Sequence, residues 1–175
     1  MILWITGLSG AGKSTLANEV AVRLRADGRP LVMLDGDELR AVFGAVAATD
    51  TNHGRQGRLA LAMQYARLCQ LIGAQGISVV IATISLFHEV HEWNRANLPG
   101  YFEAYLKVPL EELRRRDPKG IYRRFDEGTL SSVAGLDLPV DEPTAPDWTA
   151  EFTPDRGAAA LATELISELQ KRKLT

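Results

Sequence analysis

The stretch GLSGAGKS, residues 7–14, decides how this chain folds. It matches the pattern G-x-x-x-x-G-K-[ST] of phosphate-binding turns. Its glycines let consecutive backbone N–H groups point inward, because no Cβ atom stands in the way. The apolar run 2–5 before it predicts a buried strand, and 15–24 after it has apolar residues at helical spacing. A strand, a glycine-rich turn and a helix are the context that phosphate binding by this motif requires.

The chemistry of this turn predicts ATP as its ligand, with Mg²⁺ beside it. The N-terminus of the following helix adds partial positive charge that suits a polyphosphate. Lys13 is expected to reach the β- and γ-phosphates, and Ser14 is expected to hold Mg²⁺. The residues expected to bind ATP here are Gly7, Leu8, Ser9, Gly10, Ala11, Gly12, Lys13, Ser14 and Thr15.

Length and composition indicate one domain over residues 1–175. The net charge of −2, from 20 basic and 22 acidic residues, gives no reason to expect a nucleic-acid or membrane partner. The single cysteine, Cys69, is expected in the core of a protein kept in a reducing compartment. No apolar run approaches the about 18 residues of a membrane span, and no signal peptide is expected before the first predicted strand. These features favour a cytoplasmic protein.

The rest of the chain alternates strands and helices. Further strands are expected over 31–34, 79–84, 102–108 and near 150–152. Helices are expected over 14–27, 38–43, 55–74, 88–97 and 155–171. A further short helix is expected to have Pro109 as its first residue. Turn-forming residues predict loops over 44–54 and 128–150, the second of them mobile. This alternation predicts an α/β fold with a parallel sheet covered by helices on both faces.

Polar residues follow three of the expected strands, at the phosphate-binding turn, at Asp35-Gly36-Asp37 and at 83–85. In parallel sheets ligands bind beyond the carboxyl ends of the strands, so these segments are expected to share one cleft. The helix over 55–74 is expected to turn an apolar face inward. Its expected inner residues are Leu59, Met63, Ala66, Leu68 and Ile72.

Four further motifs resemble those of the adenylylsulfate kinases. They are LDGDELR (34–40), ATIS (82–85), VPLEELRRRDPKGIYRR (108–124) and GLDLPVDEP (135–143), and they follow the phosphate-binding turn in the family's order over 1–147. The resemblance implies a P-loop NTPase fold, a three-layer α/β/α sandwich with a parallel central sheet and a mobile lid over about 114–135. It also implies transfer of the γ-phosphate of ATP to the ribose 3′-hydroxyl of adenylyl sulfate. Kinases of this kind are often homodimers, although no segment here shows an interface.

Several site residues carry over from this resemblance. Asp37 resembles the carboxylate near the acceptor hydroxyl and Mg²⁺, where a positioned proton acceptor assists a hydroxyl nucleophile. Lys13 and Asp35 complete the expected catalytic set, with Asp35 orienting that site or binding the metal through water. Arg40 and Arg58 resemble the arginines that hold the substrate nucleotide, whose anionic group suits a guanidinium.

The basic segment after 113 resembles the family's lid over the phosphates. Lys119 is expected to bind substrate there, and Arg116 is expected to bind ATP. The arginine that stabilises the transferring group stays open among Arg116, Arg123 and Arg124.

The sequence departs from the family at the acceptor base. Adenylylsulfate kinases typically hold adenine between two phenylalanines, but the first position falls near Asn52-His53 and the second on Val133. The family's asparagine after the second arginine falls on Leu61. An aromatic pair contributes about 0.5–1.5 kcal/mol beyond area burial, so its loss weakens the case for adenine. Val133 is kept as a substrate-binding candidate.

The stretch TISLFHEVHEWNR, residues 83–95, is also unusual for the family. It is similar to members in surface-polysaccharide pathways, including kinases of cytidine diphosphoramidate. Ser85, Leu86 and Phe87 are substrate-binding candidates, and Phe87 either stacks on a base or packs in the core. His88 and His91 are expected at the surface or at the edge of the substrate site, because zinc normally recruits three or four ligands.

Three functions therefore remain open. The first is a kinase of the ribose 3′-hydroxyl of a small nucleotide, either adenylyl sulfate or a pyrimidine analogue such as cytidine diphosphoramidate. The second is a non-catalytic nucleotide-binding module, which would have no need for Asp37 on the acceptor side. The third is a kinase of a sugar or of a shikimate-like alcohol. The RDPKG segment, which resembles the adenylylsulfate kinases, argues against this third function.

Overall fold

The computed structural model describes residues 1–44 and 54–175 of the chain. Within this part of the chain, five strands form one sheet in the order β2-β3-β1-β4-β5. All of the neighbouring strands run parallel. The strands are β1 (Ile2–Thr6), β2 (Leu31–Asp35), β3 (Ser78–Ala82), β4 (Tyr101–Lys107) and β5 (Trp148–Glu151). The predicted parallel α/β sheet is confirmed.

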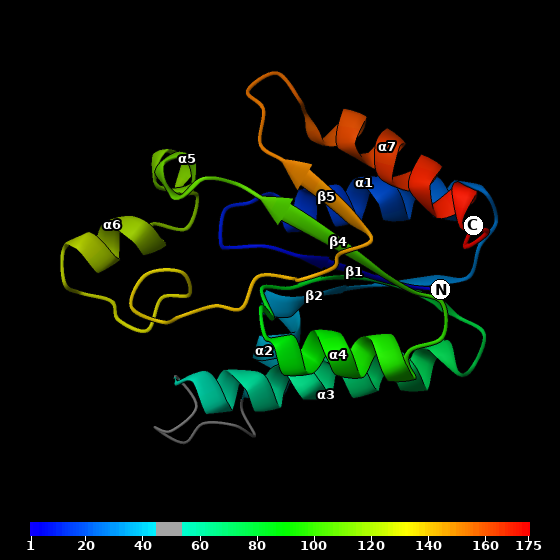
Figure 1. The fold of residues 1–175 in the computed structure, drawn as a ribbon, viewed down its shortest axis with the longest axis horizontal. Coiled ribbons are helices and arrows are strands. Elements are labelled where there is room, and N and C mark those ends of the chain that lie inside the picture. Colours follow the sequence, from blue (N-terminus) through cyan, green and yellow to red (C-terminus); the bar gives the residue numbers. More distant parts are fainter. Residues whose placement is uncertain (45–53) are drawn as a thin grey trace.

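Helices cover both faces of this sheet (Figure 1). On one face lie α1 (Lys13–Ala26) and α7 (Ala158–Lys171), and on the other lie α2 (Gly36–Gly44), α3 (Arg55–Gly73) and α4 (His88–Asn97). Two short helices, α5 (Leu110–Arg116) and α6 (Ile121–Asp126), stand beyond the carboxyl ends of the strands. Both chain termini lie at the opposite end of the sheet. The predicted three-layer α/β/α sandwich is thereby confirmed.

Strand β1 links the two layers of the core. Its side chains alternate: Leu3 and Ile5 pack with α1 and α7, whereas Ile2 and Trp4 pack on the side of α3 and α4. None of the four has exposed surface. Each such side chain contributes about 1.5–3 kcal/mol when it leaves water. The segment directly before the phosphate-binding turn is therefore fixed from both faces.

Several boundaries differ from the sequence expectations. Strand β3 ends at Ala82, because the Thr83 and Ser85 hydroxyls hydrogen-bond at 2.8 Å and Ser85 takes a left-handed φ of 28°. Pro109 precedes α5 and is not its first helical residue. Strand β5 begins and ends earlier than expected, and α7 begins only after Gly157. The expected loop over 44–54 lies almost wholly outside the described residues, as does the Asn52-His53 position.

The inner face of α3 also differs from the prediction. Its fully buried residues are Ala62, Tyr65, Ala66 and Cys69. Of the residues expected there, Leu59, Met63, Leu68 and Ile72 are only half-buried and pack against the edge of the same core. Ala66 is buried as expected, and Ala62 and Tyr65 join it on the buried face. Cys69 is buried as expected, and burial raises the pKa of its thiol to about 12.

Candidate active site

The phosphate-binding turn connects β1 to α1, as its motif predicts. Gly7 lies so close to β4 that a Cβ atom there would stand 2.7 Å from the Leu106 carbonyl oxygen. Gly12 takes a left-handed φ of 94° directly before α1 begins at Lys13. Side chains are excluded at the first position by space and disfavoured at the second by backbone strain. The turn can therefore present its N–H groups at the N-terminus of α1.

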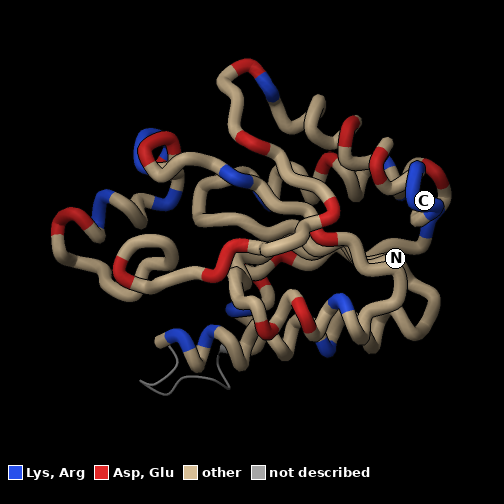
Figure 2. The backbone as a smooth tube through the Cα atoms, in the orientation of Figure 1, with Lys and Arg blue, Asp and Glu red and all other residues tan. Residues whose placement is uncertain are grey.

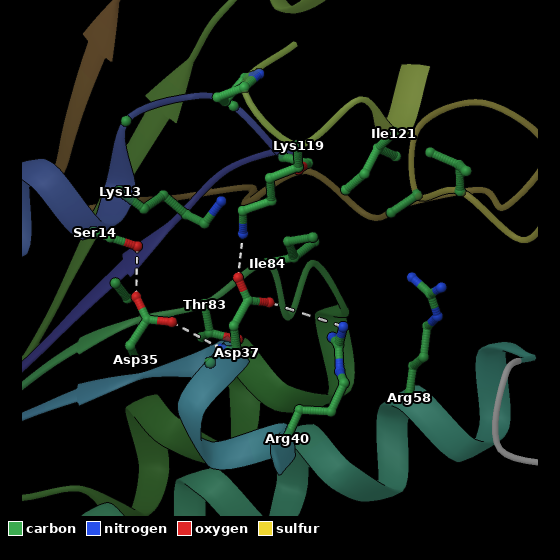
Figure 3. A pocket seen from close by; sticks show the side chains of 18 of the residues that line it. Lys13, Ser14, Asp35, Asp37, Arg40, Arg58, Thr83, Ile84, Lys119 and Ile121 are labelled. Atoms are coloured by element: carbon green, nitrogen blue, oxygen red, sulfur yellow. Dashed lines mark hydrogen bonds and ion pairs between the residues drawn. The ribbon is translucent and has the colours of Figure 1, made fainter. Parts of the chain in front are cut away.

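A cleft of about 650 Å³ opens at the carboxyl ends of the strands. It brings together the phosphate-binding turn, the end of β2, the arginines of α2 and α3, and the segment that carries Lys119 (Figure 3). Of the residues proposed from the sequence, those that line it are Ser9, Gly10, Gly12, Lys13, Ser14, Thr15, Asp35, Asp37, Arg40, Arg58, Lys119 and Val133. Gly7, Leu8 and Ala11 belong to the turn but do not line the cleft.

Lys13 reaches into this cleft from the start of α1. Its Nζ donates a hydrogen bond of 2.8 Å to the Leu8 carbonyl within the same turn. Burial, with the nearby charge of Lys119, lowers the pKa of Lys13 to about 8. Lys13 and Lys119 point toward one another across the cleft (Figure 3). Two ammonium groups that converge in this way form a site for an anion.

Asp35 ties the phosphate-binding turn to the start of α2. One carboxylate oxygen accepts a 2.5 Å hydrogen bond from the Ser14 hydroxyl, and the other accepts a 2.8 Å bond from the backbone N–H of Asp37. The second bond satisfies an N–H at the N-terminus of α2 that has no partner within the helix. Asp35 thus fixes the relative positions of Ser14 and Asp37.

Asp37 turns its carboxylate into the cleft. It forms an ion pair with Lys119, and Arg40 Nη1 lies 4.0 Å away. The hydrogen bond from Lys119 holds the pKa of Asp37 below its usual value. The group is therefore ionised at neutral pH and can accept a proton or bind a cation.

Arg40 and Arg58 line the cleft opposite the phosphate-binding turn (Figure 3). Arg40 comes from α2 and is half-exposed, whereas Arg58 comes from the first turns of α3. Arg58 Nη2 donates a 2.5 Å hydrogen bond to the Ser132 carbonyl. Burial lowers the pKa of Arg58, which nevertheless stays charged because a guanidinium does not deprotonate in proteins. The two arginines give this wall a positive charge.

A smaller cavity of about 40 Å³ adjoins this wall and shares Arg40 and Arg58 with the cleft. Ser85, Leu86 and Phe87 line this side cavity rather than the main cleft. Its further lining is Leu61, Tyr65, Thr83, Ile84, Ala134, Leu138, Pro139 and Val140. Phe87 is buried, and the Arg55 guanidinium lies 5.3 Å from its ring centroid. Phe87 thus belongs to the core and to the cavity wall together.

The lid segment brings some of its basic residues to the cleft. Lys119 and Arg124 line it, whereas Arg116 and Arg123 do not. Arg116 donates instead to Glu112 at 2.7 Å and lies over the Phe152 ring. Acidic and basic residues both occur along α5 and α6 (Figure 2). Of the three arginines left open by the sequence, Arg124 is the one that the structure places at the cleft.

The histidines of α4 separate from one another. His88 is exposed and its Nε2 contacts the Glu142 carbonyl at 3.0 Å. His91 is buried, so the expectation of a surface position is wrong for it. The buried face of the helix is formed by Val90, His91 and Asn94. Within the described residues no three His, Cys, Asp or Glu side chains gather as a metal site.

Sequence reasoning missed part of the lining. Ile121 and the segment 130–132 line the main cleft, and Tyr65 and Val140 line the side cavity. Ile121 directly follows the RDPKG motif in the sequence, so its position in the cleft could have been predicted from that motif. The segment 130–132 offered no such signal, because its position depends on hydrogen bonds from the backbone N–H groups of Ser132 and Val133 to the Asp137 carboxylate.

A family model described as adenylylsulphate kinase matches residues 1–151 of this chain. The chain belongs to the adenylylsulphate kinase family. The adenylyl-sulfate kinase of Gloeothece citriformis is 32% identical over 145 residues, which cover 83% of this chain and 80% of that protein. The cytidine diphosphoramidate kinase of Campylobacter jejuni is 37% identical over 144 residues, or 82% of each chain.

A solved relative shares the whole architecture. The APS kinase of Mycobacterium tuberculosis, solved in complex with AMPPNP and APS, superposes with a TM-score of 0.86. It is 31% identical and covers 97% of this chain and 96% of its own. The P-loop kinase fold, the use of ATP and phosphoryl transfer to a hydroxyl group are therefore properties of this family member. Among the described residues, no helix has the length and apolar character needed to cross a lipid bilayer.

Proposed function

We propose that this enzyme transfers the γ-phosphate of ATP to the ribose 3′-hydroxyl of a small nucleotide, with adenylyl sulfate as the leading acceptor. The observation that carries the proposal is the position of Asp37. Its carboxylate shares one cleft with Lys13 and Ser14 on the donor side and with Arg40 and Arg58 on the acceptor side. Asp37 therefore lies between the site for the phosphates of ATP and the site for the anionic group of the acceptor. A carboxylate at this place can accept the proton of the alcohol that attacks the γ-phosphate.

Each charged group then has a separate role. The N–H groups of the phosphate-binding turn and Lys13 hold the β- and γ-phosphates, while Arg40 and Arg58 hold the acceptor's anionic group. The acceptor hydroxyl displaces Lys119 from Asp37 and gives its proton to that carboxylate as it attacks. A new bond joins the hydroxyl oxygen to the γ-phosphorus, and the bond to the bridging β,γ-oxygen breaks to leave ADP. Lys119 and Arg124 stabilise the transferring group.

The donor side also fits Mg²⁺. Ser14, Asp35 and Asp37 present hydroxyl and carboxylate oxygens within one part of the cleft, and hard oxygen ligands are what Mg²⁺ prefers. We propose that Ser14 and Asp37 hold the ion, with Asp35 orienting Ser14. The ion would supply charge neutralisation between the β- and γ-phosphates.

One observation favours a second acceptor, a pyrimidine nucleotide such as cytidine diphosphoramidate. The side cavity next to Arg40 and Arg58 has a volume of about 40 Å³, and its aromatic residues are Phe87 and Tyr65. Val133 lines the main cleft where an adenine-stacking phenylalanine is expected. A single-ring base needs less stacking area than adenine. It therefore tolerates better the presence of Val133 in place of a stacking phenylalanine.

The two acceptors are separated by a direct assay. ADP release is measured by enzyme coupling, with ATP and Mg²⁺ present, for adenylyl sulfate and for cytidine diphosphoramidate, each against an acceptor-free control. Turnover of adenylyl sulfate supports the leading proposal, and turnover of cytidine diphosphoramidate alone replaces it with the second. If ATP binds but neither compound is phosphorylated, the nucleotide-kinase proposal fails and a binding module or an alcohol kinase gains support. ³¹P NMR of the product identifies the hydroxyl that was modified.

We further propose a cytoplasmic location and a homodimer. The location agrees with the free, buried thiol of Cys69, and it can be checked by fractionation of the producing cells. The homodimer is proposed from the likeness to related kinases. Light scattering at micromolar concentration measures the mass directly.

A further inference from the structure

A buried polar group between α4 and β4 has no role in the proposed phosphoryl transfer. His91 is 7% exposed and Glu103 on β4 is 2% exposed. His91 Nδ1 lies 3.4 Å from Glu103 Oε1, and among the described residues neither atom has a hydrogen-bond partner. Buried polar atoms are rarely left in this state, so the pair requires an explanation.

The hydrogen-bond inventory places the protons. His91 Nε2 lies 3.0 Å from the Ser85 carbonyl oxygen, which can only accept, so Nε2 carries a hydrogen. Nδ1 of a neutral imidazole is then an acceptor, and so is an ionised Glu103 oxygen. Two acceptors facing one another repel, and one proton between them converts the repulsion into a hydrogen bond.

Charged groups from several elements face this pair. Arg95 Nη2 donates to the second Glu103 oxygen at 2.9 Å, and Arg95 also binds Asp147. The charged or titratable groups around the pair are His88 and Arg95 of α4, Tyr101 of β4, Asp141 and Asp147 of the loops, and Arg172 after α7, which binds Asp147. Burial lowers the pKa of His91 to about 4 and raises that of Glu103, so both directions favour uncharged partners. The hydrogen bonds then form a chain in one direction. Arg95 donates to Glu103, Glu103 donates to His91, and His91 donates to the Ser85 carbonyl oxygen.

The end of this chain of hydrogen bonds lies at the acceptor side of the active site. Ser85 has the left-handed φ of 28°, which is rare for a residue with a side chain. The next two residues, Leu86 and Phe87, line the side cavity beside Arg40 and Arg58. A strained residue of this kind persists only where its surroundings hold it, and His91 contacts it directly.

We propose that His91 is a positioning residue for the acceptor, which fixes the Ser85–Phe87 wall of the side cavity through a proton that it shares with Glu103. The inference rests on the proposed function for its acceptor readout. It implies that loss of His91 loosens the acceptor cavity and leaves the donor side unchanged. Glu103 supports His91 and does not contact the cavity itself.

The first test compares three variants in the acceptor assay, with whichever of adenylyl sulfate and cytidine diphosphoramidate the enzyme phosphorylates. His91→Leu should raise the acceptor KM about tenfold, with the ATP KM and kcat within twofold, because the Ser85 carbonyl loses its donor. His91→Gln keeps an N–H donor at that place and should stay within about threefold of wild type. Asn94→Ala removes a neighbouring buried polar side chain from the same helix and should leave the acceptor KM unchanged.

Two results of that assay would overturn the proposal. One is an equal rise in both KM values for His91→Leu. The other is an Asn94→Ala variant that matches His91→Leu, because the effect would then be general loosening of α4. Glu103→Gln, whose amide can still donate to His91, should retain a near wild-type acceptor KM.

The second test does not need an acceptor. ¹⁵N NMR of the imidazoles should show His91 neutral, protonated on Nε2 and non-titrating between pH 6 and 8, with assignment by His91→Gln. The amide signals of Leu86 and Phe87 should shift in His91→Leu and stay in place in Asn94→Ala. A His91 that titrates near its ordinary pKa, or unmoved Leu86 and Phe87 signals, contradicts the inference. If neither nucleotide is phosphorylated, the proposed function fails, and this measurement alone decides the role of His91.

Discussion

The donor side and the acceptor side of the cleft differ in how the chain builds them. The phosphate-binding turn of the donor side is one continuous segment, 7–15, placed by β1 and the N-terminus of α1. The acceptor side is assembled from α2, α3, the segment after β3 and the loop around 133. A continuous segment can hold one ligand chemistry through backbone groups alone. An assembled wall depends on side chains, so its specificity can change while the fold stays the same.

The substitution that should affect turnover most is Asp37→Ala. Loss of the carboxylate that accepts the acceptor's proton should lower kcat by about 10²–10⁴-fold. ADP affinity, measured by calorimetry, should stay within about threefold, because the phosphates are held by the turn. Glu38→Ala, which changes an exposed acid next to it, is the matched control and should be silent. A kcat near wild type in Asp37→Ala would remove Asp37 from the mechanism.

Lys13→Ala should damage the donor side itself. Loss of this charged donor should reduce kcat/KM for ATP by about 10²–10³-fold, and ADP should bind more weakly as well. Arg25→Ala, an exposed basic residue at the other end of α1, should behave as wild type. Unchanged ADP affinity in Lys13→Ala would show that the backbone groups suffice, and the contrast between the two sides would become sharper still.

Arg58→Ala should act on the acceptor side alone. The lost charge-assisted hydrogen bonds should raise the acceptor KM by about 10–100-fold, with the ATP KM unchanged. Arg67→Ala, on the exposed face of the same helix, is the control. An equal rise in both KM values would mean that the two sides are coupled through α3, which contradicts the separation proposed here.

The smallest expected effect is a pH dependence on the donor side. Burial lowers the pKa of Lys13 to about 8 in the free enzyme, and a bound phosphate favours the charged form. ADP affinity should therefore be full below pH 8 and fall as pH rises above it, by about an order of magnitude at pH 9. Calorimetry of wild type and Lys13→Ala over pH 7–9.5 measures the effect, which should be absent in the variant. A flat wild-type profile would contradict the lowered pKa.

Local sequence signals were enough for the phosphate-binding turn and for most of the fold. The glycines of the phosphate-binding turn occur at a fixed spacing that identifies the backbone conformation of the turn. The boundaries of α4 agree with those predicted from the pattern of apolar and polar residues. Alternating strands and helices implied the parallel sheet, because such strands need helical crossovers. These features depend on neighbours in the sequence.

Tertiary contacts decided what the sequence did not show. Leu59 and Met63 are as apolar as any inward-facing residue, yet α3 buries Ala62 and Tyr65 more completely. His91 looked like a surface residue on polarity, and only its contacts with Ser85 and Glu103 account for its burial. Arg116 was expected at ATP from its place in the lid motif, but Glu112 on the same helix holds it away from the cleft.

The placement of the two termini has a practical consequence. Both ends of the chain emerge at the end of the sheet that is remote from α5, α6 and the cleft (Figure 1). A fused partner, an affinity tag or a surface linker can therefore be attached at either end without standing in the path of the nucleotides. Immobilised enzyme should turn over as fast as free enzyme, whichever terminus anchors it.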